Sequence, residues 1–254
     1  MNRTERIDLL HKIAHTINHD HNGHFVAGET ERLELIQELL KETGYRLTEI
    51  GLCHLYSKIP LTELKEKQDS IIVISSHVDT HENITEPFSE IREENKLYGT
   101  YDNSITNAAV LTLMLEDRLP EHVVVAFTGN EEQAMRGATT LGMYLNDHHS
   151  RAKVIVTDVT DRGYKGKNAF SLENSCNCSR WTVKVMKTLA DSEFKWKLRD
   201  IYMDDESCSY YGLGFECMSI CIPTKGKMHS NSGLKTRLST YNKYIDALCL
   251  AACA

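Results

Sequence analysis

The sequence predicts an α/β fold with a mainly parallel, twisted central sheet and helices on both of its faces. Short apolar runs rich in Val and Ile, which are typical of buried strands, alternate with longer segments of helical periodicity. This alternation favours parallel strands joined by helices. The 254 residues contain no internal repeat and no low-complexity linker, so we expect a single domain, of a size common among enzymes, over residues 1–254.

The central strand is expected at residues 71–74, because four apolar β-branched residues precede the polar Ser75, Ser76 and His77. Further buried strands are expected at residues 122–127, 153–157, 168–172 and 216–222, and an extended segment at 194–202. Residues 45–50 and 52–59 predict an antiparallel pair that turns near Gly51. Residues 91–99 predict a hairpin that turns at Glu94 and Asn95.

Apolar residues at helical spacing predict helices at residues 7–17, 29–42, 105–116, 133–146, 178–191 and 240–252. Thr30 or Glu29 is expected to cap the second helix, which stops at Gly44. Asn103 or Ser104 is expected to cap the third. Loops are expected at residues 80–89 and 224–230.

Composition and charge exclude several classes of function. The net charge of -7 and the lack of a basic run argue against nucleic acid, because phosphate binding needs clustered Lys and Arg. The charged amino terminus and the lack of a long apolar run argue against a membrane protein, so a cytoplasmic location is expected. The eight cysteines include no CxxC pair and are expected to be reduced thiols.

The amino-terminal region is rich in histidine, with five of the twelve histidines inside fourteen residues. His11, His15 and His19 recur every four residues on one face of the first predicted helix, and His21 and His24 follow. A weak transition-metal site is one interpretation. A solvated helix face and loop is the favoured one, because no carboxylate pattern fixes a coordination geometry.

Residues of metal-binding type follow successive predicted strands and loops. In a parallel sheet, ligands gather at the carboxyl ends of the strands. Each residue alone has a structural explanation, as a helix cap, a first-turn acid, a turn former or a loop histidine. Their joint occurrence instead favours one shared site, made of His77, Asp79, Asp102, Glu131, Glu132, Asp158 and His229.

The order of these motifs is specific: His-Val-Asp at 77–79, Gly-Thr-Tyr-Asp-Asn at 99–103, Thr-Gly-Asn-Glu-Glu at 128–132, then Asp158 and a late histidine. It resembles the co-catalytic metallopeptidase superfamily, which includes zinc aminopeptidases and acylases, from residue 71 to the end. The resemblance implies a phosphorylase/hydrolase-like three-layer sandwich.

Two short intervals indicate the branch of that superfamily. The interval from His77 to Asp102 leaves no room for the extra domain of the tetrahedral aminopeptidases. The 71 residues from Asp158 to His229 leave no room for the lid domain of the carboxypeptidase and acylase branch. The chain is therefore expected to be closest to the compact single-domain zinc aminopeptidases, with no lid domain.

The resemblance also implies roles for the site residues. Asp102 would bridge two divalent metal ions, with His77 and Asp158 on one ion and Glu132 and His229 on the other. Zinc is favoured by the mixed nitrogen and oxygen donors, and cobalt or manganese would also fit.

Glu131 would be the general base, and Asp79 would hold His77 in place. Related enzymes shape their substrate pocket near residues 203–212. By that comparison Asp205 could meet a substrate amine and Tyr210 or Tyr211 a developing oxyanion, while surface turn residues are the alternative interpretation.

The implied activity is hydrolysis of amide bonds by a water that two metal ions activate, and an aminopeptidase acting on small peptides is the leading hypothesis. A two-metal deacylase or dipeptidase, acting on an N-acyl amino acid or a dipeptide, is the nearest alternative. From other classes, an inactive metal-binding module and a structural protein without metal are also considered. The intact pair Glu131 and Glu132 argues against an inactive module. A homo-oligomer is compatible with the sequence.

Overall fold

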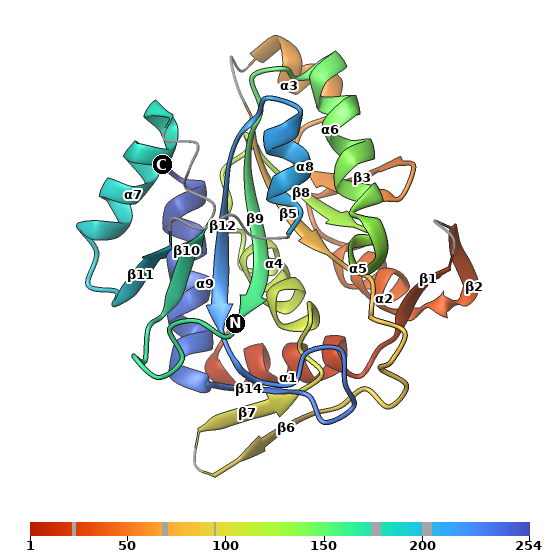
Figure 1. Cartoon of the computed structure of the whole chain (residues 1–254). Coiled ribbons are helices and arrows are strands. Elements are labelled where there is room, and N and C mark those ends of the chain that lie inside the picture. The colour runs from red at the N-terminus through yellow and green to blue at the C-terminus, as the bar shows by residue number, and fades with distance from the viewer. Residues whose placement is uncertain (22–23, 68–70, 94, 174–178, 200–204) are drawn as a thin grey trace.

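The computed structural model describes residues 1–21, 24–67, 71–93, 95–173, 179–199 and 205–254, without the side chains of residues 20–29 and 65–67 (Figure 1). Its centre is an eight-stranded sheet in the order β11-β10-β12-β9-β5-β8-β4-β3. The strands are β3 (Arg46–Ile50), β4 (Cys53–Ser57), β5 (Ile72–His77), β8 (Val123–Thr128), β9 (Lys153–Thr160), β10 (Phe170–Glu173), β11 (Trp196–Arg199) and β12 (Glu216–Pro223).

The four central strands β12, β9, β5 and β8 run parallel to one another. The flanking strands β10 and β4 run antiparallel to their inner neighbours β12 and β8, and β3 pairs antiparallel with β4. The prediction of a mainly parallel central sheet is therefore confirmed, and the antiparallel strands lie toward its edges.

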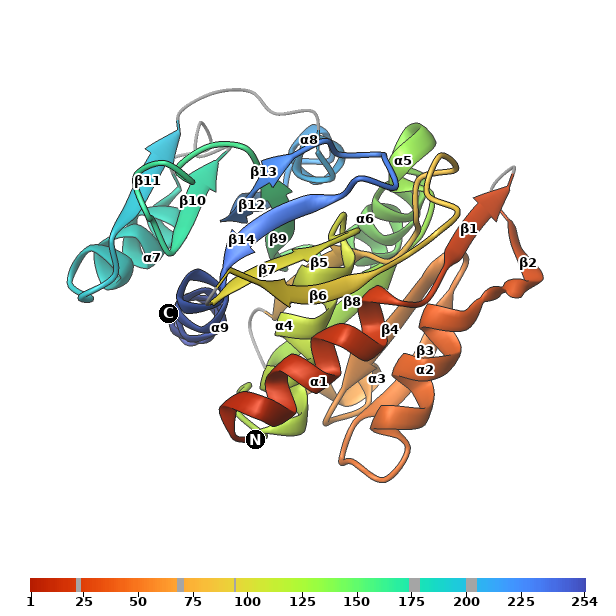
Figure 2. The same ribbon diagram turned by 90° about the horizontal axis from the view of Figure 1, so that it is seen from below.

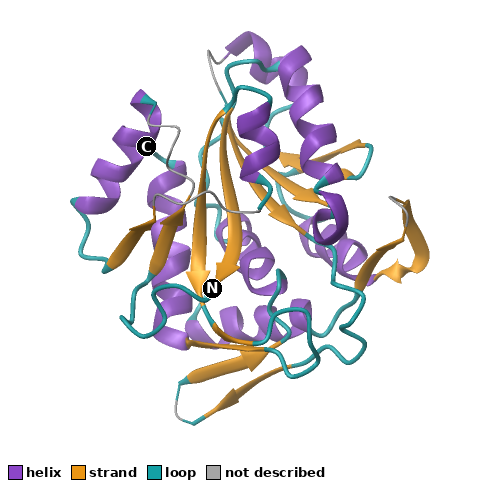
Figure 3. Ribbon diagram, viewed as in Figure 1, coloured by secondary structure: helices purple, strands orange, loops and turns teal. Residues whose placement is uncertain are grey.

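Helices cover both faces of the sheet (Figure 3). One apolar cluster joins the sheet to α1 (Arg3–Ala14), α2 (Glu31–Leu40), α4 (Ser104–Leu115), α7 (Arg180–Ala190) and α9 (Leu238–Ala252). A second cluster joins the other face to α3 (Leu61–Lys67), α6 (Arg136–His148) and α8 (Ser207–Gly212).

Side-chain alternation along β5 explains why its sequence is apolar without interruption. Ile72 and Ile74 pack into the first cluster, whereas Ile71 and Val73 pack into the second. Successive residues of a strand point to opposite faces, so a strand buried on both faces needs apolar residues at every position.

A smaller four-stranded sheet lies beside the carboxyl ends of the central strands (Figure 2). It has the order β13-β14-β7-β6, with β6 (Ser89–Arg92), β7 (Lys96–Gly99), β13 (Lys225–Gly226) and β14 (Leu234–Arg237). The predicted hairpin is confirmed as β6 and β7, although Glu94 lies outside the described residues. Because β14 pairs with β7 from Leu234 to Arg237, the chain after β12 is brought next to the segment that precedes α4.

The amino-terminal region differs from the prediction. The first helix ends at Ala14, and His19 lies in β1 (Asn18–His21), which forms a hairpin with β2 (His24–Thr30) where a loop was expected. His11, His15 and His19 therefore do not share one helix face. Backbone hydrogen bonding explains the early end, because the amide of Thr80 donates to the carbonyl oxygen of Asn18 at 2.8 Å. Tertiary pairing overrides the helical periodicity here.

The helix predicted at residues 133–146 is divided into α5 (Glu131–Ala134) and α6, and Met135 between them has a left-handed φ of 52°. The amide of Gly137 donates to the carbonyl oxygen of Gly129 at 2.9 Å. A Cβ at Gly137 would lie 2.4 Å from that oxygen, so only glycine permits this approach. Because of this break, Glu131 and Glu132 lie on the short helix α5 and not on α6.

The helix predicted at residues 178–191 is confirmed as α7, with residue 178 outside the described part. The extended segment of residues 194–202 is β11, with residues 200–202 outside the described part. The cysteines that the structure describes are all free thiols, and Cys176 and Cys178 lie outside that part. No helix within the described ranges has the length and apolar character needed to cross a bilayer.

Candidate metal centre

All seven residues that the sequence singles out for metal chemistry meet at the carboxyl end of the central strands. His77 ends β5, and Asp79 follows it. Asp102 precedes α4, and Glu131 and Glu132 open α5. The remaining two are Asp158, in β9, and His229, in the connection between β13 and β14.

Asp102 lies between the two histidines. Its Oδ1 is 3.3 Å from Nε2 of His77, and its Oδ2 is 3.3 Å from Nε2 of His229. The side chain is almost completely buried. One carboxylate therefore presents a separate oxygen to each of two groups of side chains, which is the arrangement needed by a bridging ligand.

The possible ligand atoms form overlapping groups: those of His77 also lie within 4.8 Å of those of Glu131 and Glu132, and those of His81 lie that close to Glu132 and His229. On one side, Oδ1 of Asp158 lies 3.8 Å from Nε2 of His77, and ligand atoms of His77, Asp102 and Asp158 lie within 4.8 Å of one another. On the other side, Oε2 of Glu132 lies 3.1 Å from Nε2 of His229. Glu131 stands beside the first group, with Oε2 4.0 Å from Nε2 of His77.

Asp79 connects two parts of the centre without reaching its middle. Its Oδ1 lies 3.3 Å from Nδ1 of His77, and its Oδ2 accepts a hydrogen bond of 3.1 Å from the amide of Glu132. A carboxylate on the distal nitrogen of an imidazole fixes the orientation of the ring and directs the other nitrogen. Asp79 thus anchors the first turn of α5 by a hydrogen bond and places its other oxygen beside the His77 ring.

The lengths of β9 and its neighbouring strands determine where Asp158 lies. The strand predicted to end at residue 157 continues to Thr160, because β12 pairs with it as far as Pro223. The pairing of β5 with β9 stops at Ser76 and Thr157. Asp158 is therefore inside β9 and not after it, and it is the first residue of β9 beyond those paired with β5.

Two positions next to the centre have a left-handed backbone. Asn130, directly before Glu131, has a φ of 57°, and His229 has a φ of 53°. Residues other than glycine adopt this region at a cost of about 1–2 kcal/mol, and such positions cluster at functional sites.

The centre holds more negative charge than its own side chains can balance. Burial and the nearby carboxylates raise the pKa of Glu131 to about 9 and that of Glu132 to about 10. Burial likewise raises the pKa of Asp158 to about 6. Burial also favours the neutral form of Asp102, but contact with His229 and His77 outweighs it and holds the pKa of Asp102 below its usual range.

The donor set fits two divalent cations. Imidazole nitrogens and carboxylate oxygens are the ligands that zinc accepts, and each group supplies one histidine, one carboxylate of its own and a share of Asp102. Oε1 of Glu132 is buried and has no hydrogen-bond partner among the described residues. A buried carboxylate oxygen without a partner is costly, and a cation would supply that partner.

Three further residues support the centre and were not found from the sequence. Arg32, on the buried face of α2, donates to the carbonyl oxygen of Val78 at 3.0 Å. Asn107 in α4 donates to the carbonyl oxygen of His77 at 2.9 Å. The ring of His81 stacks on that of His229, with centroids 4.3 Å apart. The helical spacing of Arg32 with Leu33, Ile36 and Leu40 could have marked it as buried.

The residues expected to bind substrate are not gathered in the centre. Tyr210 is fully buried against the sheet, with its hydroxyl 2.9 Å from Oγ of Ser75, so it cannot contact a substrate. Tyr211 is 51% exposed on α8. Asp205 is buried, and its Oδ1 accepts a hydrogen bond of 2.9 Å from the amide of Ser207. Most of the region that was expected to shape the substrate pocket, residues 203–212, is the helix α8.

Glu206 is a buried acid next to these residues. It accepts hydrogen bonds from the hydroxyls of Ser75, at 2.8 Å, and Thr128. Burial raises its pKa from 4.5 to about 7. The native state therefore binds more protons than the unfolded state between these values, and stability falls as the pH rises from about 4.5 to about 7.

We expect the isosteric Glu206→Gln substitution to remove this loss of stability. Above pH 7 the variant should avoid a free-energy cost of about 3 kcal/mol, because a pKa difference of one unit corresponds to about 1.36 kcal/mol. Urea unfolding at pH 5 and pH 8 measures the effect: the gain of the variant over the wild type should be larger at pH 8. An equal difference at both pH values would contradict the raised pKa.

A cavity of about 420 Å³ opens onto the centre, and its wall includes Asp102, Glu131, Glu132, Asp158 and His229. The five side chains thus reach a space that is large enough for a small ligand. The arrangement can hold two cations beside a carboxylate, Glu131, that has access to the same space.

The fold and the family are supported by comparison with known proteins. The profile of Peptidase family M28 matches residues 61–240. A comparison with curated proteins gives no match. The TET aminopeptidase of the marine sediment archaeon Thaumarchaeota archaeon SCGC AB-539-E09 has a TM-score of 0.76 at 13% identity, with 97% of this chain and 96% of that chain covered.

Two further solved structures are similar. Aminopeptidase APDkam598 of the archaeon Desulfurococcus kamchatkensis gives a TM-score of 0.71 at 13% identity, covering 98% of this chain and 94% of that one. The TET1 peptidase of Pyrococcus horikoshii gives 0.70 at 13% identity, with 99% of both chains covered. The short interval from His77 to Asp102 predicted that this chain differs from the tetrahedral aminopeptidases by lacking their extra domain. The TET chains nevertheless match this chain over nearly their whole length.

At such low identity the solved structures establish the fold alone. The family profile carries more, because it covers well over half of the chain and contains every residue from His77 to His229. This chain therefore belongs to peptidase family M28, the co-catalytic zinc aminopeptidase family, and is a metal-dependent peptidase.

Proposed function

We propose that this chain removes the amino-terminal residue from small peptides with the help of two divalent metal ions. The position of Asp102 carries the proposal, because its two oxygens each lie 3.3 Å from a different histidine. A single shared carboxylate between two donor groups is the geometry expected of a two-metal hydrolase.

In this proposal His77 and Asp158 hold one ion, Glu132 and His229 hold the other, and Asp102 serves both. Zinc is the proposed metal, because mixed imidazole and carboxylate donors suit it, and cobalt or manganese fits the same donors. The bound ions would supply a water molecule acidic enough to act as a nucleophile at neutral pH and positive charge at the substrate carbonyl.

Glu131 is the proposed proton carrier. It borders the cavity, and its Oε2 lies 4.0 Å from Nε2 of His77. Its carboxylate is near enough to His77 and Glu132 to share a cation with them, and the proposal assigns the metal to Glu132 and the proton to Glu131. From this place Glu131 can accept the proton of the attacking water and return it to the departing amine. Asp79 keeps the His77 ring oriented through its contact with Nδ1.

The test of this function is a comparison of substrates that differ only at the amino terminus. Zinc-loaded protein should hydrolyse alanine tripeptide from its amino end and leave the N-acetylated tripeptide intact. Release of acetate from N-acetyl amino acids would instead support the deacylase alternative. Metal-loaded protein that cleaves none of these compounds would overturn the proposed function.

Metal binding should also stabilise the fold, because it offsets the crowded carboxylates. At a free zinc concentration of about 1,000 times Kd, each ion contributes about 4 kcal/mol. Removing the metal with a chelator should lower the thermal midpoint by roughly 8–16 °C for each such ion, and adding zinc back should restore it. A midpoint that chelation leaves unchanged would contradict the proposed sites.

We also propose that residues 1–254 form one catalytic domain and that copies of it associate. The central sheet shares its two apolar clusters with helices from both ends of the chain, which supports a single folding unit. One structural neighbour is described as a dodecamer, and the TET1 peptidase is described as assembling into a tetrahedron or an octahedral shell. Sedimentation of the purified protein measures the assembly.

A further inference from the structure

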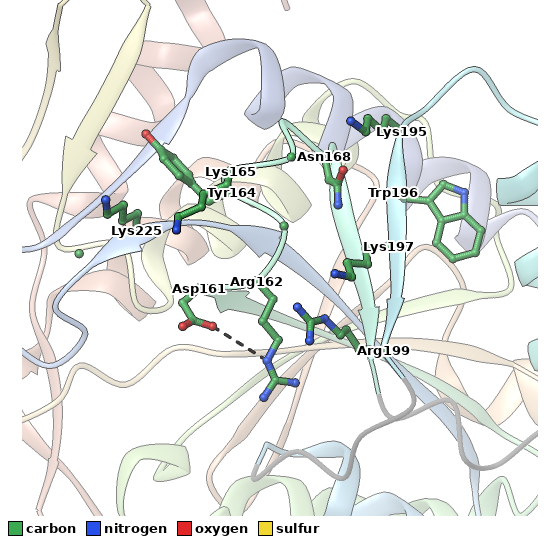
Figure 4. A pocket seen from close by; sticks show the side chains of 13 residues that line it. Asp161, Arg162, Tyr164, Lys165, Asn168, Lys195, Trp196, Lys197, Arg199 and Lys225 are labelled. Atoms are coloured by element: carbon green, nitrogen blue, oxygen red, sulfur yellow. Dashed lines mark ion pairs between the residues drawn. The ribbon is translucent and has the colours of Figure 1, made fainter.

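A basic cavity of about 740 Å³ is lined by the loop after β9 and by residues of β11 and β13 (Figure 4). This volume is in the range of ligand-binding pockets. The chain as a whole has a net charge of -7, yet among the described residues that line this cavity Asp161 is the one carboxylate. Its basic residues are Arg162, Lys165, Lys195, Lys197, Arg199 and Lys225.

Within the part of the chain that the structure describes, most of these positive charges have no carboxylate partner. Arg162 is paired, since Nη1 lies 3.5 Å from the buried Glu173. Among residues that the structure describes, no carboxylate lies within 4.0 Å of the charged groups of the other five. Nε of Arg199 is buried and lacks a hydrogen-bond partner within the same ranges. An anionic ligand would provide both the charge and the acceptor that are missing.

The charges also converge. Figure 4 shows Lys197 and Arg199, which both belong to β11, extending toward Arg162 from the loop after β9. Like charges that share a cavity repel one another, and the repulsion grows where protein walls lower the effective dielectric constant. Glu173 balances the charge of Arg162, so Lys197 and Arg199 are the two cations here that an anion in this space would balance.

Two chain segments connect this cavity to the metal centre. Asp161 follows Asp158 by three residues, so their Cα atoms lie within about 11 Å. Lys225 precedes His229 by four residues, which limits that separation to about 14 Å. An extended peptide advances about 3.3 Å per residue. These limits apply to the near edge of the cavity, and β11, which carries Lys197 and Arg199, lies three strands from β9, or about 14 Å away. A peptide of about four residues that is held at the metal centre can thus extend a carboxylate to the basic cavity.

We propose that this cavity binds carboxylates of acidic peptide substrates and gives the enzyme a preference for them. The inference rests on the proposed function, because peptides are the anions that the adjacent centre would bring to the cavity. The carboxylate can come from the side chain of the first residue or from a residue beyond the cleaved bond. The chemistry of recognition is the same for both sources.

Matched peptides test the preference. Zinc-loaded protein is given the amidated tetrapeptides Ala-Ala-Glu-Ala and Glu-Ala-Ala-Ala, each beside its Gln counterpart, at low and high salt. In at least one pair, kcat/KM for the Glu peptide should exceed that for the Gln peptide by tenfold or more at low salt. Salt should reduce the ratio because it screens the attraction. The pair that responds identifies the source of the carboxylate.

Substitutions in the wall then connect the preference to the cavity. The double substitution Lys197→Gln with Arg199→Gln should bring the ratio of Glu to Gln peptides close to one. Lys225→Gln, from the opposite wall, should reduce it several-fold. Lys243→Gln on the exposed surface of α9 is the control and should keep both the ratio and the activity. Thermal midpoints verify that each variant is folded.

Two results would overturn the inference: equal kcat/KM within every pair, or a preference that survives the double substitution. Failure of the proposed function is distinguishable, because then neither member of any pair is hydrolysed. In that case a dye-labelled tetra-Glu peptide and its tetra-Gln control measure binding to the zinc-loaded protein. Tighter binding of the Glu peptide that is lost in the double variant supports the cavity, and equal binding refutes it.

Discussion

Replacing Glu131 with alanine should reduce turnover by roughly 10²–10⁴ while the protein keeps both metal ions. Glu131 borders the cavity but is not one of the proposed ligands, so its removal leaves every donor in place. Proton transfer matters chiefly in the transition state. The loss should therefore appear in kcat, with KM little changed, in steady-state kinetics of the zinc-loaded variant.

Glu132→Ala is the matched control, because it deletes the same side chain from the neighbouring position. Oε2 of Glu132 lies 3.1 Å from Nε2 of His229, so this variant should lose metal from that group. Metal analysis after dialysis separates the two variants. The assignment is wrong if Glu131→Ala sheds metal as readily as Glu132→Ala, or if it keeps near-normal turnover.

Asp102→Asn should weaken both metal sites together. The substitution keeps the shape of the side chain but removes its charge and replaces one of its two oxygens with an amide nitrogen that cannot coordinate a cation. Because each oxygen faces a different histidine, the stoichiometry should fall from close to two ions toward zero. Loss of several kcal/mol of charge stabilisation implies a decrease in turnover on the order of 10³-fold or more.

Asp158→Asn provides the comparison for Asp102→Asn, since Asp158 lies 3.8 Å from His77 and in no group with His229. It should weaken one ion and spare the other. Zinc titration followed by calorimetry gives the number of sites and their affinities in both variants. An Asp102→Asn protein that loses one ion only would show that Asp102 is a terminal ligand and not a bridge.

The sequence by itself determined the sheet and the candidates for the site. Uninterrupted apolar runs, such as Ile71 to Ile74, predict strands that are buried on both faces, and the structure places them at the centre of the sheet. Because such strands end where polar residues begin, the motifs around His77 and Glu131 could be assigned to strand ends before any coordinates.

Local patterns failed where long-range pairing decides the conformation. The helical spacing of residues 7–17 extends to His19, but the helix ends at Ala14, and hydrogen bonding between Asn18 and Thr80 accompanies an extended strand from Asn18 to His21. The helix predicted from residue 133 is broken because Gly137 packs on the backbone of Gly129. Neither contact is visible in a window of neighbouring residues.

The tertiary structure alone decided how the site is arranged and what surrounds it. Pairing of β14 with β7 brings His229 to Asp102, although 126 residues separate them in the chain. Burial of Tyr210 removed it from the substrate site, and the basic cavity joins lysines from β11 and β13 that no single stretch of sequence contains. Such features depend on which distant segments pack together, and the free energy of that packing is shared across the whole fold.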